Sequence, residues 1–196
     1  MKVVCFANNL VGFSLTSWLR KQPGVEVAAT VIHSKPVRRD FDQRAGGPDT
    51  ITYSTGLSQI NLLGSFGADL GLSLFFGHIF PPEITTLFPR GIINLHSGYL
   101  PSARGRNPNV WSIVERLQAG ATLHYVDGGV DTGDIIAQAR TEVLPTDTGE
   151  TLYRRLEDTC IALFRDTWPS ILDGTAPRTP QPPSPITPHR LADLAN

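Results

Sequence analysis

The sequence predicts an α/β fold, in which helices cover both faces of an open, mostly parallel sheet. Residues 2–7 and 25–32 have the apolar character of buried strands, and residues 10–22 between them have the pattern of a helix that Asn9 can cap. A strand, a helix and a strand at this spacing favour a right-handed βαβ unit. Residues 69–76 form a near-continuous apolar run, which is typical of a strand covered on both faces.

The same alternation continues along the chain. The further expected elements are short helices at 60–66 and after Pro81, strands at 91–96, 121–126 and 134–138, and helices at 107–118 and from Asp147 to Gly174. Asp147 and Glu150 form a D-x-x-E capping pattern at the start of the last helix. The apolar residues of that helix fall on one side, namely Leu152, Leu156, Cys160, Leu163 and Phe164. Residues 33–53 are polar and rich in glycine, which predicts a long excursion from the sheet.

The C-terminal end has a different composition. Residues 177–188 hold six prolines, which exclude a regular helix and predict an extended segment over the surface. We therefore expect one domain over residues 1–175, followed by a proline-rich tail over residues 176–196.

Composition and charge describe a globular protein. The chain has 196 residues, of which 40% are hydrophobic and 18% charged, and its net charge of −1 gives no electrostatic reason to expect a nucleic-acid or membrane partner. No apolar run reaches membrane-spanning length, and the start has no secretory signal pattern. The two cysteines, Cys5 and Cys160, fall in apolar patterns and fit a reducing cytosol, so we expect a cytoplasmic protein.

Two polar side chains interrupt the apolar strand at residues 91–96. Asn94 and His96 share one face of this strand, because alternate side chains of a strand point the same way. They stand at its carboxyl end, where open α/β sheets bind ligands. The pair therefore marks either a catalytic site or two satisfied, partly buried polar residues.

A glycine-rich loop at residues 125–136 carries three acids. Its glycines let a backbone approach a ligand closely, and Asp127, Asp131 and Asp134 lie among them. A tight hairpin with side-chain turns is the alternative. The spacing is not that of a calcium loop, and no histidine or cysteine pair supports another metal, so we expect no metal.

Taken together, these segments resemble the formyltransferases that use N10-formyltetrahydrofolate. The resemblance is carried by Asn-x-His at 94–96, LPSARG at 100–105, VDTGDII at 130–136 and SLFFGHIFPP at 73–82. It is strong over residues 68–138, weaker over the first strand and the last helix, and absent over 34–60 and the tail. It implies the Rossmann-like fold of that family and the transfer of a formyl group to a primary amine.

The resemblance implies catalytic roles for Asn94, His96 and Asp131, and the chemistry supports them. When an amine attacks a formyl carbon, negative charge develops on the formyl oxygen, and the Asn94 amide can donate to it. His96 titrates near neutral pH and can carry the proton. Asp131 would orient the imidazole or relay the proton through water. The sequence leaves open which of His96 and Asp131 is the formal base.

The resemblance also implies where the folate co-substrate binds. In this family main-chain groups hold the pterin, and the corresponding residues are Phe75, Phe76, Gly77, His78 and Ile79 together with Val126, Asp127, Gly128, Gly129 and Val130. Phe76 and Phe80 either wall this pocket or are ordinary core aromatics. The side chains of His78 and His124 receive no chemical role.

The acceptor follows from the branch of the family that the chain resembles. Residues 96–113 are most similar to the enzymes that formylate amino sugars on nucleotide carriers, which implies Ser97, Gly98, Tyr99, Arg104 and Arg106 as acceptor-binding residues. The two arginines suit a diphosphate, or simply keep the loop soluble. The glycinamide ribonucleotide branch has a glycine-rich phosphate loop where this chain reads Ala7-Asn8-Asn9. The barrel of the methionyl-tRNA branch and the regulatory domain of the hydrolase branch have no counterpart in the sequence.

Other functions remain open. The acceptor can instead be another small amine, such as an antibiotic or siderophore precursor. A non-catalytic module that binds a small molecule is the alternative from a different class. An NAD-dependent enzyme is disfavoured because no G-x-G-x-x-G follows the first strand. A homodimer is one option for the association state, which the sequence leaves open.

Overall fold

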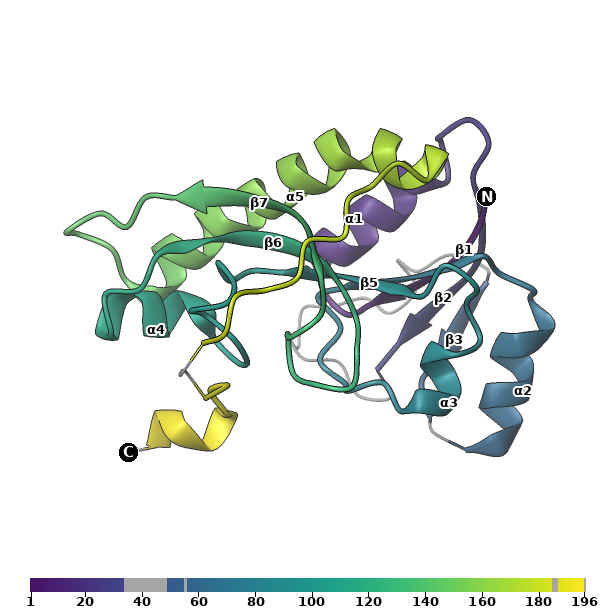
Figure 1. The fold of residues 1–196 in the computed structure, drawn as a ribbon, viewed down its shortest axis with the longest axis horizontal. Helices are drawn as coiled ribbons and strands as arrows, with labels where there is room; N and C mark the ends of the chain where they lie inside the picture. Colours follow the sequence, from purple (N-terminus) through teal and green to yellow (C-terminus); the bar gives the residue numbers. More distant parts are fainter. Residues whose placement is uncertain (34–48, 55, 185–186, 196) are drawn as a thin grey trace. The chain divides into compact units, whose positions relative to one another are not determined.

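The computed structural model describes residues 1–33, 49–54, 56–184 and 187–195 (Figure 1). Among these residues, seven strands form one sheet in the order β3-β2-β1-β4-β5-β6-β7. The pairings of β1 with β2 and β4, and of β2 with β3, are parallel, and only the last pair, β6 with β7, is antiparallel among the pairings described. The chain divides into two compact units, Met1–Asn94 and Leu95–Asn196, and β5 runs from one into the other. The predicted open, mostly parallel α/β sheet is confirmed.

The first unit begins with the predicted βαβ segment. Its elements are β1 (Lys2–Ala7), α1 (Leu10–Leu19) and β2 (Glu26–Ile32). Asn9 caps α1 as predicted, since its side-chain oxygen accepts the Gly12 N–H at 2.8 Å. A side chain at Gly12 would lie 2.6 Å from the Leu74 carbonyl oxygen, so the glycine lets the helix approach the sheet closely.

The remainder of the first unit surrounds the central strand β1. It comprises β3 (Thr50–Thr52), α2 (Leu57–Ser65), β4 (Leu70–Leu74), α3 (Pro82–Thr85) and the start of β5 (Ile92–His96). The predicted polar excursion at 33–53 lies largely outside the described residues. The prediction that this excursion continues to residue 53 is wrong, because Thr50–Thr52 forms a strand that pairs in parallel with β2. Three residues, two of them threonines, are too short a run to show a strand period.

The second unit contains the antiparallel pair β6 (Ala119–Tyr125) and β7 (Ile135–Thr141), together with α4 (Pro108–Val114) and α5 (Gly149–Asp173). α5 packs along both strands and contacts α4 (Figure 1). Its buried residues include the predicted apolar face from Leu152 to Phe164, and Leu152 and Leu156 meet Ala119 of β6 in one core cluster. Gly174 ends α5 with a left-handed backbone (φ 83°), as a C-terminal glycine should.

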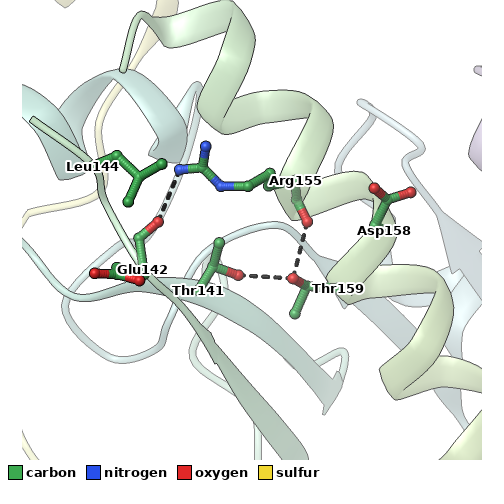
Figure 2. Close-up of a pocket in the computed structure, with 6 residues that line it drawn as sticks. All are labelled: Thr141, Glu142, Leu144, Arg155, Asp158 and Thr159. Atoms are coloured by element: carbon green, nitrogen blue, oxygen red, sulfur yellow. Dashed lines mark hydrogen bonds between the residues drawn. The ribbon is translucent and has the colours of Figure 1, made fainter. Parts of the chain in front are cut away.

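The start of α5 corrects the predicted capping pattern. Thr148, not Asp147, is the N-cap, and its hydroxyl accepts the Thr151 N–H while the Thr151 hydroxyl accepts the Thr148 N–H. Asp147 lies one residue earlier and pairs with Arg155. Arg155 also donates to the Glu142 carbonyl at the rim of a shallow hollow beside α5 (Figure 2). A D-x-x-E pattern cannot distinguish an N-cap from the residue before it when a threonine stands between them.

The chain after α5 is extended over the described part of 177–190, and a short 3₁₀ helix, η2 (Leu191–Ala195), follows. Thr179 forms an antiparallel bridge with Ile135, and His189 forms a parallel bridge with Gly105. In the described residues, no helix is both long and apolar enough to cross a membrane.

Candidate active site

His96 ends β5 as a buried side chain with 8% of its surface exposed. Its Nε2 lies 2.7 Å from the Ala103 carbonyl oxygen. Because a carbonyl only accepts, this nitrogen carries a proton, and the chemically variable nitrogen is Nδ1. A side chain at Gly98 would lie 2.4 Å from both the ring nitrogen and that carbonyl oxygen. The predicted acceptor residue Gly98 therefore makes room for the imidazole and its hydrogen bond.

Asp131 comes from the glycine-rich loop and meets the histidine within the second unit. Its Oδ2 lies 3.8 Å from His96 Nδ1, and the Gly105 N–H donates to the same oxygen at 2.9 Å. The backbone of Asp131 is left-handed (φ 53°), a conformation that aspartate tolerates better than most residues. The structure thus brings together two of the three predicted catalytic residues. Asn94 lies two residues before His96 on β5 and is half-buried.

His124, near the end of β6, is a residue that the sequence analysis missed. Its Nε2 lies 3.5 Å from Asp131 Oδ1, and its Nδ1 donates to the Tyr125 carbonyl at 2.8 Å. Asp131 therefore has an imidazole at each carboxylate oxygen. The sequence held one usable signal, a histidine at the end of an apolar strand directly before the loop that carries Asp131.

The charge of Asp131 is set by these neighbours. Burial alone would raise its pKa, but the charges of His96 and His124, with the hydrogen bonds from His124 and the Gly105 N–H, hold the pKa well below its usual range. The carboxylate is thus ionised at neutral pH, and each of its oxygens faces one imidazole.

The predicted pterin segment of the first unit has aromatic surroundings. The Gly77 N–H meets His33 Nε2 at 3.2 Å, and the His33 ring lies 4.6 Å from Phe76 and 4.3 Å from His78. Tyr53 stacks on His78 at 4.9 Å. The histidine side chains here therefore belong to an aromatic cluster.

Two aromatic residues in and next to this segment are buried, whereas its last residue is exposed. Phe76 and Phe80 pack on Phe6, with ring centroids 5.4 and 4.8 Å away, as core aromatics do. Phe75 has a left-handed backbone (φ 59°), and Ile79 is 76% exposed. An exposed isoleucine next to buried aromatics offers apolar surface at the end of β4.

The predicted pterin segment of the second unit, residues 126–130, is a turn stabilised from within. Asp127 Oδ1 accepts the Gly129 N–H at 3.0 Å and the Thr132 hydroxyl at 2.6 Å. A side chain at Gly128 would meet no atom within 4 Å, and Val130 is partly exposed. Asp127 therefore shapes the loop while the backbone at Gly128 stays accessible.

The predicted acceptor residues differ in their contacts and in their exposure. Arg104 Nη2 donates to Gln181 Oε1 at 3.0 Å, and the Arg140 guanidinium lies 5.6 Å from the Tyr99 ring centroid. Ser97 is half-buried and Arg106 is exposed. Over the described ranges, no group of three or more histidine, cysteine or acidic side chains is arranged to hold a metal ion.

The chain is similar to several known proteins. It is 36% identical over 125 residues to the methionyl-tRNA formyltransferase of Agathobacter rectalis, a match that covers 63% of this chain and 40% of that protein. This chain thus spans about two fifths of the length of that relative. Among solved structures, a 4-N formyltransferase from Francisella tularensis matches with a TM-score of 0.85 and 25% identity, covering 98% of this chain and 77% of that one.

A second solved structure carries ligands. The formyltransferase PseJ from Anoxybacillus kamchatkensis, in complex with UDP-4,6-dideoxy-4-formamido-L-AltNAc and tetrahydrofolate, matches with a TM-score of 0.74 and 28% identity, covering 100% of this chain and 88% of that one. A family model for formyl transferases matches residues 20–166, three quarters of the chain, and includes Asn94, His96 and Asp131. The chain belongs to the formyl transferase family.

Proposed function

We propose that this chain transfers a formyl group from N10-formyltetrahydrofolate to a primary amine, the amino group of a nucleotide-linked amino-deoxysugar. The observation that carries the proposal is the pairing of His96 with Asp131 in a chain of the formyl transferase family. The donor supplies the formyl carbon, and as the new carbon–nitrogen bond forms and the old one breaks, one proton leaves the amine and one reaches the donor nitrogen.

The proton passes through the space between His96 and Asp131. With Nε2–H held by the Ala103 carbonyl, His96 exchanges protons through Nδ1, which faces the carboxylate. The 3.8 Å from Nδ1 to Oδ2 is too long for a hydrogen bond, so a water or the amine itself bridges the two groups. The anionic Asp131 favours the imidazolium that forms when His96 takes the proton.

Asn94 stabilises the charge on the formyl oxygen. Its side-chain amide is the nearest donor along β5 to His96, two residues before it on a strand whose alternate residues share a face. A neutral donor in a half-buried position stabilises an oxyanion without competing for the proton that His96 moves.

The loop at 126–130 fits a role in holding the folate by its main chain. Its backbone is accessible at Gly128, and Asp127 satisfies the turn internally, so the loop keeps its shape with one side open. In the first unit, Phe75 to Ile79 present exposed apolar surface at Ile79, while the Gly77 N–H is directed at His33. For each segment by itself, the family resemblance assigns its main-chain groups to the pterin.

The acceptor assignment rests on the 96–113 segment and on the likeness to PseJ. Arg106 is exposed and Arg104 is half-buried, and a guanidinium group suits a phosphate. Ser97, Gly98 and Tyr99 follow His96 directly and border the acceptor. We place this activity in the cytoplasm, which the two free, buried cysteines fit.

An acceptor panel tests the proposal. The purified protein with N10-formyltetrahydrofolate is given UDP- and dTDP-linked 4-amino sugars, glycinamide ribonucleotide, methionyl-tRNA and simple amines, and tetrahydrofolate formation is followed. We expect the highest kcat/KM with a nucleotide-linked amino sugar. A preference for methionyl-tRNA, the substrate named for the Agathobacter rectalis relative, would overturn the acceptor but keep the chemistry. Absence of transfer to every acceptor would favour a binding module.

A further inference from the structure

The chain after α5 contacts the Asp131 loop, residues 126–134 between β6 and β7, at its beginning, middle and end. The Arg178 guanidinium lies 3.6 Å from the ring centroid of Tyr125, the last residue of β6 before the loop. Thr179 exchanges two backbone hydrogen bonds with Ile135, the first residue after it, at 2.8 and 3.0 Å. We call residues 178–181 the tail clasp.

Gln181 binds the middle of the loop through its amide nitrogen and Arg104 through its amide oxygen. Its Nε2 donates to the Asp131 carbonyl at 3.0 Å and to the Gly133 carbonyl at 2.8 Å, and its Oε1 accepts from Arg104 at 3.0 Å. Asp131 has a left-handed backbone, which costs energy in a residue other than glycine and persists only where neighbours fix it. The Gln181 amide thus binds the carbonyl of that strained residue and the carbonyl two residues after it.

The same end of the chain also fixes the donor to the Asp131 carboxylate. His189 pairs with the backbone on both sides of Gly105, since its N–H donates to the Arg104 carbonyl at 3.1 Å and its carbonyl accepts the Arg106 N–H at 2.8 Å. A side chain at Gly105 would lie 2.2 Å from the His189 carbonyl oxygen. The glycine that donates to Asp131 is therefore a glycine because the tail passes against it.

We propose that Gln181 is a positioning residue for Asp131 and that the tail clasp belongs to the active site. This inference rests on the proposed function for its kinetic consequences and on geometry alone for its structural ones. Gln181 restrains the main chain that carries the carboxylate, while the Gly105 N–H restrains the carboxylate itself. Together they fix the distance from Asp131 to His96.

Substitution of Gln181 separates this role from general stabilisation. Gln181→Met keeps the length of the side chain and removes its hydrogen bonds, so we expect kcat to fall about tenfold, as misplaced catalytic groups do, with KM changed less than about twofold. Gln181→Glu keeps an acceptor for Arg104 but turns carboxylate oxygens toward two carbonyls, and it should lose as much. A near-native Gln181→Glu enzyme would show that Arg104, not Asp131, is the group being held.

The matched control is Gln118→Met. Gln118 is exposed, lies in the same unit and, among the described residues, donates to the carbonyl of its neighbour Ala119, so the same change there should leave kcat unaltered. In a cycle with Asp131→Asn, Gln181→Met should add little to the loss already caused, because the two act as a unit. Losses that simply multiply would overturn the proposal.

Hydrogen exchange gives a readout that needs no activity. In Gln181→Met the Gly105 amide and the amides of residues 126–134 should exchange at least about tenfold faster than in the native protein, while those of β6 keep their rates. Unchanged exchange at Gly105 would refute the clasp even if kcat fell. If the native chain transferred formyl to no acceptor, the proposed function would fail, and this measurement would still decide the structural claim.

Discussion

Asp131 and Asp147 are two aspartates of the second unit whose pKa values are both held well below the usual range, for different reasons. Asp131 is flanked by two imidazoles, those of His96 and His124, and an imidazole can gain or lose a proton. Asp147 is held first by hydrogen bonds from Arg155, then by the Leu144 N–H and the Thr151 hydroxyl. Arginine keeps its charge at every pH that proteins tolerate.

The contacts around Asp147 stabilise the start of α5. Arg155 links it to the Glu142 carbonyl, and next to it the Thr141 and Thr159 hydroxyls meet at 2.8 Å (Figure 2). Each of these contacts ties the end of β7 to α5. A lowered pKa therefore identifies an active site only when the neighbouring groups can themselves exchange protons. The predictions below test this difference.

The largest effect is expected at His96. His96→Asn keeps a side-chain amide but removes proton transfer, so kcat should fall by about 10²- to 10⁴-fold. Asp131→Asn should lose a comparable amount, and the double variant little more, because the two share one proton pathway. Steady-state kinetics on the three variants checks this. If the losses of kcat in the two single variants multiply in the double variant, the two residues do not share one proton pathway, although the family assignment is unaffected.

Asn94 comes next. Asn94→Ala should lower kcat by about 10²- to 10³-fold and leave folate affinity nearly unchanged, because its amide acts on charge that develops in the transition state. Kinetics and equilibrium folate binding measured on the same preparation check it. Near-native turnover would remove Asn94 from the mechanism.

His124 should have a smaller effect than His96. His124→Gln removes the imidazole at Asp131 Oδ1 and leaves the His96 side of the carboxylate intact, so we expect kcat to fall about 10- to 100-fold through misplacement of Asp131. The pKa of Asp131 should rise, since the charge and the hydrogen bond of His124 both lower it. An NMR titration of the Asp131 carboxyl group measures this rise, and an unchanged pKa with reduced kcat would assign His124 a packing role.

Asp147 should affect stability and not catalysis. Asp147→Asn should leave kcat unaltered and lower Tm by about 2–4 °C, because it weakens the Arg155 contacts at the start of α5. Thermal unfolding beside a kinetic assay tests this. A large loss of kcat in Asp147→Asn would invalidate the distinction drawn between the two aspartates.

The pH dependence of stability gives the smallest effect. An acid whose pKa is lower in the folded than in the unfolded chain stabilises the fold above its unfolded pKa of about 3.9, and this contribution is lost as pH falls below that value. Tm should therefore decline below about pH 4 in the native protein. The decline should be shallower in Asp147→Asn, which a series of thermal scans between pH 6 and pH 2.5 would measure.

Much of the fold could be predicted from local pattern. The βαβ segment, the cap at Asn9, the apolar face of α5 and the glycine at its end are encoded by residues a few positions apart, so periodicity and capping rules reach them. These rules did not predict the short strand Thr50–Thr52 or the N-cap at Thr148. The strand exists because β2 offers it an edge, and the cap depends on the backbone angles of one residue.

The candidate site divides in the same way. Sequence alone determined that Asn94 and His96 share a strand face and that Asp131 lies in a glycine-rich loop, because both follow from chain-local geometry and family motif. Only the tertiary structure decided that His124, Gly105 and Gln181 all meet Asp131. These residues lie 7, 26 and 50 positions from Asp131. Their contacts arise from the antiparallel turn between β6 and β7 and from the return of the tail, which no short-range pattern encodes.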